Sequence, residues 1–436
     1  MANPLIAIVG RPNVGKSTFF NKVVGKKISI TEDKPGVTRD RLYADSEWRG
    51  KAFTMVDTGG IEMRSEDTMW KEIKKQAEVA IDTAQVILFF VDGKEGITSS
   101  DYDVAEILRR SKKPVILVVN KIDEYSEEKV FEFYALGLGE PYAVSAEHST
   151  GIGDVLDEAV SWFEKGENQD DDSIKIAVVG KPNAGKSSLV NRLLGFERSI
   201  VTDIAGTTRD AIDTRLSYGG KDYTIIDTAG IRKKSRVEDS IEYYSQLRAY
   251  DAVRRADVCL LVVDSAEGLT EQDTKIIGYV HEQGKPSLIV MNKWDLIEKD
   301  TNTINKFQTK LSEDLKFMDY FKSVYISAKT GQRAEKLFAL IDEVYDHAHF
   351  RVPTGTLNDL IADTVRANEP PSYNGRRLKV YYSSQVAVAP PTFILKVNST
   401  DLLHFSYERF LENVLRKNFD FSGTPIKIYA RENSDK

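Results

Sequence analysis

GRPNVGKST (residues 10–18) and GKPNAGKSS (residues 180–188) are two copies of one glycine-rich stretch, 170 positions apart. Each copy follows a short apolar run and precedes an amphipathic stretch, so the pattern predicts a loop between a strand and a helix. Backbone N–H groups in such a loop, together with the aligned dipoles of the following helix, favour phosphate oxygens. The sequence therefore predicts two phosphate-binding loops.

The repetition extends far beyond these two stretches. Four further motifs recur in the same order at offsets of 170 to 182, namely PGVTRD (35–40) with AGTTRD (205–210), VDTGGI (56–61) with IDTAGI (226–231), NKID (120–123) with NKWD (292–295), and SAE (145–147) with SAK (327–329). The order is kept while the spacing drifts, as expected when insertions collect in loops. A whole domain is therefore duplicated.

Short apolar runs alternate with amphipathic stretches in both copies, which indicates a parallel sheet covered by helices on both faces. We expect the α/β class, with two P-loop NTPase (Ras-like G) domains in tandem and a small α+β domain in the order α-β-β-α-β. The predicted boundaries are 1–165 for the first domain, 166–173 for an acidic linker, 174–350 for the second domain and 351–436 for the third.

Composition limits the class of protein. At 436 residues, 41% hydrophobic and 29% charged, the chain resembles a globular protein with several cores. The net charge is −7, but residues 351–436 carry 12 Lys and Arg against 9 Asp and Glu. The chain has no apolar run of membrane-spanning length, no basic leader, and one cysteine, Cys259, in an apolar run. We expect a cytoplasmic protein without a membrane partner, in which Cys259 is packed and inert.

Each residue type in the glycine-rich loop has a physical role in binding phosphate. Glycines let the backbone approach the phosphates, the lysine brings positive charge to the terminal phosphates, and the serine hydroxyl is a ligand for Mg²⁺. The predicted nucleotide-binding residues here are Gly10, Asn13, Val14, Gly15, Lys16, Ser17 and Thr18, and Gly180, Asn183, Ala184, Gly185, Lys186, Ser187 and Ser188.

The NKxD and SA motifs predict which base is bound. The carboxylates of Asp123 and Asp295 accept two hydrogen bonds from the N–H edge of guanine, which adenine cannot supply. The lysines would lie along the base, the asparagines would hold the phosphate loop, and the SA motifs would offer backbone donors to the guanine oxygen. The residues are Asn120, Lys121, Asp123, Ser145 and Ala146, and Asn292, Lys293, Asp295, Ser327 and Ala328.

The remaining motifs predict a metal site and a switch. Asp57 and Asp227 would hold Mg²⁺ through water, beside the hydroxyls of Ser17 and Ser187. Polar loops after the phosphate loops would reach the same ion only with a triphosphate present, and relax after hydrolysis. The residues with a predicted catalytic role are Lys16, Thr38, Gly60, Lys186, Thr208 and Gly230, of which Thr38 and Thr208 are also metal ligands.

The motifs GxPNxGKS, TRD, DTxGI and NKxD resemble those of Era/TrmE-type GTPases, and the tandem arrangement resembles the Der (EngA) family over essentially the whole chain. This resemblance implies a monomeric GTPase that acts with rRNA in maturation of the large ribosomal subunit, with a KH-like C-terminal domain. It also implies that Asn13 and Asn183 help to hold K⁺. The alternative is that these asparagines shape the loop through side-chain to backbone bonds.

Three alternatives remain open at this stage. Ile61 and Ile231 stand where Ras-type proteins place a glutamine, so turnover is expected to be slow, and a nucleotide-dependent scaffold with one poorly hydrolysing site is the rival function. An ATP-using nucleotide kinase is disfavoured by the guanine-selecting aspartates. No GxxG clamp follows residue 350, so contact with rRNA phosphates depends on surface cations, with packing as the other possibility: Arg376, Arg377 and Lys379, or Arg416 and Lys417.

Overall fold

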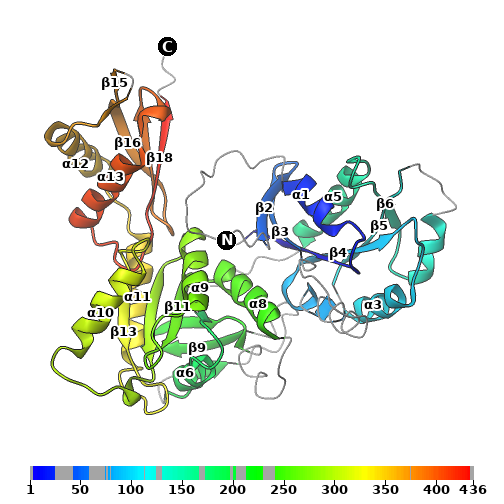
Figure 1. Cartoon of the computed structure of the whole chain (residues 1–436), viewed down its shortest axis with the longest axis horizontal. Helices are drawn as coiled ribbons and strands as arrows, with labels where there is room; N and C mark the ends of the chain where they lie inside the picture. Colours follow the sequence, from blue (N-terminus) through cyan, green and yellow to red (C-terminus); the bar gives the residue numbers. More distant parts are fainter. Residues whose placement is uncertain are drawn as a thin grey trace. The chain divides into compact units, whose positions relative to one another are not determined.

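The computed structural model describes residues 3–24, 43–57, 74, 77–78, 80–111, 113–123, 130–165, 172–196, 200–202, 213–228, 241–373 and 375–432. The chain forms two compact units, shown in Figure 1. One comprises Met1–Asp171 with Asp239–Arg248, and the other comprises Asp172–Glu238 with Ala249–Lys436.

The first unit contains a six-stranded sheet in the order β2-β3-β1-β4-β5-β6, in which only β2 runs antiparallel to its neighbour. The strands are β1 (Leu5–Val9), β2 (Tyr43–Trp48), β3 (Lys51–Asp57), β4 (Val86–Asp92), β5 (Val115–Asn120) and β6 (Pro141–Ala143). The helices around the sheet are α1 (Lys16–Val24), α3 (Ser99–Arg110) and α5 (Ile152–Ser161). This is the expected parallel α/β arrangement, with β1 leading directly into the glycine-rich loop and α1.

The second unit repeats this sheet with one more strand, in the order β13-β12-β11-β7-β10-β9-β8. Its strands are β7 (Ile174–Val179), β8 (Ile200–Thr202), β9 (Thr214–Tyr218), β10 (Lys221–Ile225), β11 (Val258–Asp264), β12 (Ser287–Asn292) and β13 (Lys322–Tyr325). Its helices are α6 (Lys186–Leu194), α9 (Glu271–Glu282), α10 (Thr303–Asp314) and α11 (Lys336–His349), together with the part of α8 (Ile241–Arg255) that starts at Ala249. The duplication predicted from the motifs is therefore a duplication of the fold.

The C-terminal part of the second unit is a small α+β domain. Helices α12 (Thr354–Ala367) and α13 (Phe405–Asn418) lie against one face of a three-stranded sheet of β16 (Val380–Ala387), β17 (Thr392–Val397) and β18 (Lys427–Glu432), as Figure 1 shows. The expected order α-β-β-α-β is confirmed. The sequence did not predict the short hairpin of β14 (Ser372–Tyr373) and β15 (Arg376–Arg377), because two-residue strands leave no periodic pattern.

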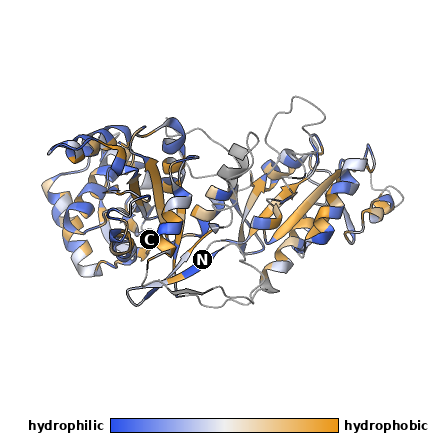
Figure 2. Ribbon diagram, turned by 90° about the horizontal axis from the view of Figure 1, so that it is seen from below, coloured by the Kyte–Doolittle hydropathy of each residue, from blue (hydrophilic) through white to orange (hydrophobic). Residues whose placement is uncertain are grey.

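The cores follow the apolar pattern. Every residue of β4 and of β11 is buried, as expected for central strands covered on both faces. Figure 2 shows strands in hydrophobic colours between helices of mixed colour. Cys259 lies within β11, and burial raises the pKa of its thiol to about 12, so it is inert as predicted. No helix in the described part of the chain combines the length and apolarity that crossing a bilayer requires.

Within the second unit, the loop around Gly423 joins the C-terminal domain to the second G domain. The Gly423 N–H donates to the Tyr320 carbonyl at 2.8 Å, and the Gly423 carbonyl accepts from the Ser287 N–H at 2.8 Å. Gly423 has φ +73°, and a Cβ there would overlap the side chain of Val344. The Arg416 guanidinium lies 4.4 Å from the centre of the Tyr320 ring. The glycine is therefore needed for close packing between domains.

Candidate nucleotide-binding sites

The two glycine-rich loops lie at the carboxyl ends of β1 and β7, where ligands of open α/β sheets bind. Gly10 and Gly180 pass so close to a neighbouring strand that a Cβ would overlap the carbonyl oxygen of Phe90 or Val262. The glycines are therefore required by the approach of two backbones, before any ligand is considered.

Each loop lysine folds back over its own loop. The Lys16 ammonium donates to the carbonyls of Gly10 and Arg11, both at 2.7 Å. The Lys186 ammonium donates to the carbonyls of Gly180 and Lys181, both at 2.6 Å. Burial lowers the pKa of Lys16 to about 8, although the nearby Asp57 carboxylate opposes the shift. An ammonium group held against backbone carbonyls, and buried at Lys16, is a good site for an added phosphate.

Two buried asparagines tie the base-binding loops to the phosphate loops. The Asn120 amide donates to the Val14 carbonyl at 2.7 Å, while its oxygen accepts from the Ala146 N–H at 2.9 Å. Asn292 makes the same pair of bonds, to the Ala184 carbonyl at 2.9 Å and from the Ala328 N–H at 2.9 Å. Three motifs far apart in sequence therefore meet at one side chain in each domain. The bond to the phosphate loop was expected from the sequence, and the bond to the SA motif was not.

The carboxylates predicted to select guanine, Asp123 and Asp295, lie next to the SA motifs. The Ser145 hydroxyl donates to Asp123 at 2.9 Å. A hydrogen bond from Lys94, followed by that from Ser145, lowers the pKa of Asp123. A hydrogen bond from Ser327 lowers the pKa of Asp295. Both carboxylates are therefore ionised at neutral pH, as acceptance of two hydrogen bonds from a base requires.

The residues that hold the NKxD lysines were not predicted from the sequence. The Lys121 ammonium lies 2.6 Å from Asp92, and the Lys293 ammonium lies 2.6 Å from Asp264. Both lysines have positive φ, +67° and +60°. A signal was present, since an aspartate ends the apolar run VILFFVD and also its counterpart VCLLVVD. Each aspartate fixes the lysine stem beside the position where the base would lie.

The residues predicted to hold Mg²⁺ differ between the domains. The Ser17 hydroxyl donates to Asp57 at 2.7 Å, and Asp57 is buried at the end of β3. Asp227 lies beyond the end of β10 with φ +56°, and its N–H donates to Asp213 at 2.9 Å. Hydroxyl and carboxylate oxygens are the ligands that Mg²⁺ prefers, so the Ser17 and Asp57 pair fits the ion.

Several predicted residues cannot be placed. Thr38, Gly60, Thr208 and Gly230 lie outside the described residues, as do Ile61 and Ile231. Their roles in catalysis and metal binding remain predictions.

The two loop asparagines predicted to hold K⁺ have equivalent conformations. Asn13 and Asn183 both have φ +63°, and both are exposed. In the described ranges, neither side chain takes part in a hydrogen bond, so the side-chain bonds of the loop-shaping alternative are not seen there. Thr18 and Ser188, beside the loop lysines, are exposed as well.

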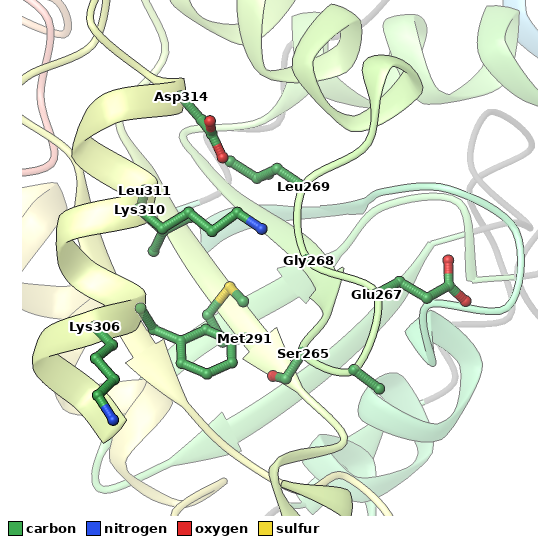
Figure 3. Close-up of a pocket in the computed structure, with 11 residues that line it drawn as sticks. Ser265, Glu267, Gly268, Leu269, Met291, Lys306, Lys310, Leu311 and Asp314 are labelled. Atoms are coloured by element: carbon green, nitrogen blue, oxygen red, sulfur yellow. The ribbon is translucent and has the colours of Figure 1, made fainter. Parts of the chain in front are cut away.

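A separate cavity of about 230 Å³ lies beside the loop that follows β11. Figure 3 shows it between this loop, around Ser265 and Gly268, and the side chains of α10, including Lys310. No residue predicted to bind nucleotide lines the cavity, so it is distinct from the candidate sites.

The C-terminal cations divide into packed and free side chains. Arg416, considered a candidate for RNA contact, instead donates to Glu412 at 2.7 Å and to the carbonyls of Phe421 and Thr424 at 3.0 and 2.9 Å. Arg377 pairs with Glu369. For Arg416 the packing interpretation holds, because its donors are used within the domain. Arg377 is exposed and makes one exposed ion pair, so RNA contact by Arg377 remains a prediction.

Comparisons with known proteins agree with this geometry. Residues 5–121 and 175–293 match a family described as 50S ribosome-binding GTPase. Residues 351–431 match a family described as KH-domain-like of EngA bacterial GTPase enzymes, C-terminal.

Curated relatives match over the full length. The chain is 56% identical over 436 residues to the GTPase Der of Acetivibrio thermocellus, and 55% identical over 436 residues to that of Ruminiclostridium cellulolyticum, with 99% of both chains covered in each case. Among solved structures, Aquifex aeolicus Era bound to GDP and AlF4⁻ is 22% identical with a TM-score of 0.30, covering 58% of this chain and 88% of that chain. With two G domains, a KH-like domain and full-length relatives, the chain belongs to the Der family of GTPases.

Proposed function

We propose that this GTPase binds GTP at both G domains and uses the nucleotide state to control its association with the large ribosomal subunit during assembly. One observation carries the nucleotide part of the proposal. In each domain a buried asparagine joins the phosphate loop, the guanine-selecting loop and the SA motif, so base and phosphates are sensed in one pocket. The family description as 50S ribosome-binding GTPase supports the ribosomal part.

The described residues divide the work of binding. Asp123 and Asp295 orient guanine, while Lys16 and Lys186 place a positive charge against the terminal phosphates. Ser17 and Asp57 would hold Mg²⁺, as would Ser187 and Asp227, and the ion supplies neutralisation of phosphate charge when bound. The glycine-rich loops add backbone N–H groups that cost no reorganisation.

Co-sedimentation with isolated ribosomal subunits tests the ribosomal part. We expect the chain to sediment with the large subunit in the presence of a non-hydrolysable GTP analogue and to be released with GDP. Lys16→Ala and Lys186→Ala are the test variants. Each removes the ammonium of one phosphate loop and should weaken nucleotide-dependent sedimentation. Equal sedimentation with both nucleotides, or association with the small subunit alone, would contradict the proposal.

We further propose that K⁺ binds beside the phosphates, held by Asn13 and Asn183. The exposure and conformation of both asparagines support this assignment. A cation at this position would offset developing charge as an arginine finger does. GTP hydrolysis should be faster in KCl than in NaCl at matched ionic strength, and Asn13→Ala with Asn183→Ala should remove the difference. Equal rates in the two salts would refute the assignment.

A second function is favoured by one difference between the domains. Asp57 is the last residue of β3, whereas Asp227 lies beyond the end of β10 and adopts positive φ. This supports a scaffold role in which the second site binds GTP and hydrolyses it slowly. Single-turnover hydrolysis by Lys16→Ala, which leaves only the second site, should then be much slower than hydrolysis by Lys186→Ala.

A further inference from the structure

The three-stranded sheet of the C-terminal domain has two unlike faces. Phe393, Leu395 and Val397 of β17 point into the core with α12 and α13. The alternate residues of β17 point the other way, and strand register brings two rows of side chains together there. The first row is Tyr382, Lys396 and Arg431, and the second is Ser384, Ile394 and Tyr429. We call this surface the open face.

The open face is aromatic and basic. Tyr382 and Tyr429 are both 48% exposed, although large apolar rings usually pack when a core is near. Lys396 and Arg431 lie side by side in the first row, and Lys427 follows at one end of β18. None of the described positions on this face is acidic, so its charge is uniformly positive.

The polar groups of four side chains on this face have no partner among the described residues. In the part of the chain that the structure describes, Tyr382, Tyr429, Lys396 and Arg431 make no side-chain hydrogen bond or ion pair. Arg416, by contrast, has its donors engaged within the domain. Within the described residues, two unpaired cations therefore lie beside two exposed rings on this surface.

This combination fits single-stranded nucleic acid. Bases stack on exposed aromatic rings, and a positive surface attracts the backbone phosphates. Neighbouring strands lie about 5 Å apart, and alternate residues along a strand lie about 7 Å apart. Tyr382 and Tyr429 lie on strands that flank β17 and in neighbouring rows, so their rings are more than one ring width apart. Each ring can therefore stack on a different base. A duplex hides its base faces and would meet only the cations.

We propose that the open face of the C-terminal sheet binds single-stranded RNA, with Tyr382 and Tyr429 stacking on bases and Lys396 and Arg431 contacting phosphates. The binding surface is the sheet itself, and no glycine clamp is needed. This inference deepens the proposed function by naming the class of ribosomal partner that the C-terminal domain contacts.

Fluorescence anisotropy with the full-length chain and a labelled 12-nucleotide single-stranded RNA tests it. We expect Tyr382→Ala and Tyr429→Ala each to weaken binding about tenfold, which is about 1.4 kcal/mol, while Tyr382→Phe and Tyr429→Phe retain binding because the ring is kept. The double change Lys396→Gln with Arg431→Gln should reduce the slope of log affinity against log salt by about 1.4, since each single-strand phosphate contact contributes about 0.7.

Two matched variants control for exposure and charge. Tyr102→Ala removes a tyrosine that is 46% exposed on α3, and Lys417→Gln removes an exposed cation on α13, in the helical layer of the same domain. Both should leave RNA binding unchanged. Equal affinity for a duplex of the same sequence, or no loss in either Tyr→Ala variant, would overturn the proposal.

The proposed function is measured separately. If wild-type protein sediments with the large subunit but does not bind the RNA, or its tyrosine variants bind like wild type, only the open-face inference fails. If wild-type protein does not sediment with the large subunit at all, the ribosomal role fails, whatever the RNA measurement shows.

Discussion

Asn120 and Asn292 each use both ends of one carboxamide. The amide donor fixes the phosphate loop and the oxygen fixes the SA motif, while Gly15 or Gly185 lies so close that a Cβ would overlap the same amide. The motif pattern predicted that these loops meet. Spacing alone did not reveal that a single side chain makes the connection, because distance along the chain says nothing about which atoms meet.

The carboxylate of Asp295 provides a prediction about the base. Asn in its place offers one acceptor and one donor, so it no longer matches the two N–H donors of guanine and instead matches a purine with a carbonyl at position 2. We expect Asp295→Asn to weaken GDP binding at the second site at least about a hundredfold and to allow binding of xanthosine diphosphate. Titration should give one GDP per chain.

The control for this substitution is Asp300→Asn. Asp300 is an exposed acid on the same loop that pairs with Lys306 at 2.8 Å. It should leave both sites intact. Two GDP per chain for Asp295→Asn would show that the carboxylate does not read the base.

Burial of Lys16 provides a prediction about pH. Its pKa is about 8 in the folded protein and near 10.5 in an unfolded chain, so the unfolded state holds more protons between these values. The free energy of unfolding of nucleotide-free protein should therefore rise with pH across this window. Phosphates favour the charged ammonium, so GDP binding at pH 8.5 should take up a fraction of a proton.

Calorimetry in two buffers of different ionisation enthalpy measures that proton. Lys186→Ala confines binding to the first site, so the uptake belongs to Lys16. Identical binding heats in the two buffers would show that Lys16 keeps its proton throughout.

At the scale of elements, buried strands were the easiest to predict. The runs VILFFVD and VCLLVVD became β4 and β11, because seven apolar or strand-ending residues between turn signals have few alternatives. The order of the C-terminal elements was also predictable. The contacts of Arg416 could not be predicted. A cation on an amphipathic helix has the same sequence pattern whether it faces solvent or, as here, bonds the carbonyls of Phe421 and Thr424.

Arg416 connects α13 to the loop that meets the second G domain. We expect Arg416→Ala to lower the free energy of unfolding by about 2 to 4 kcal/mol, because it removes the donor to the Glu412 carboxylate and to the carbonyls of Phe421 and Thr424, of which Phe421 keeps the Thr424 N–H. Arg416→Lys should recover little, since one ammonium cannot replace a planar fork of donors. Denaturant unfolding followed by circular dichroism measures both.

The comparison for this change is Arg366→Ala. Arg366 is exposed on α12 and pairs only with Asp363, so its loss should change stability by less than about 0.5 kcal/mol. An Arg416→Ala protein as stable as Arg366→Ala would show that the contacts around Tyr320 do not hold the junction.

For the whole molecule, the duplication was readable because five motifs recur in one order. The seven-stranded sheet of the second domain was not, since β8 is three residues long and carries no pattern of its own. The attachment of the C-terminal domain to the second G domain was also hidden, because it depends on backbone hydrogen bonds at Gly423 that any sequence with a glycine could make.

The division into two units predicts an independent fragment. Residues 172–436 contain the cores of the second G domain and of the C-terminal domain. We expect this fragment to fold alone, to unfold in one cooperative transition and to bind one guanine nucleotide by calorimetry. The same fragment with Lys186→Ala should stay folded but bind none. Two separate transitions would mean that the Gly423 junction does not couple the domains.

Strand β12 begins at Ser287, whose N–H is bonded to Gly423, and ends at Asn292 in the second pocket. Six extended residues span about 20 Å, and the strand is paired with β11 on one side and β13 on the other. The strand therefore forms a stiff connection. The second candidate nucleotide site lies at its carboxyl end, and the C-terminal domain is bonded to its amino end. A displacement at either end of β12 would be transmitted along the strand, so the strand offers a direct mechanical link between the C-terminal domain and the second candidate nucleotide site.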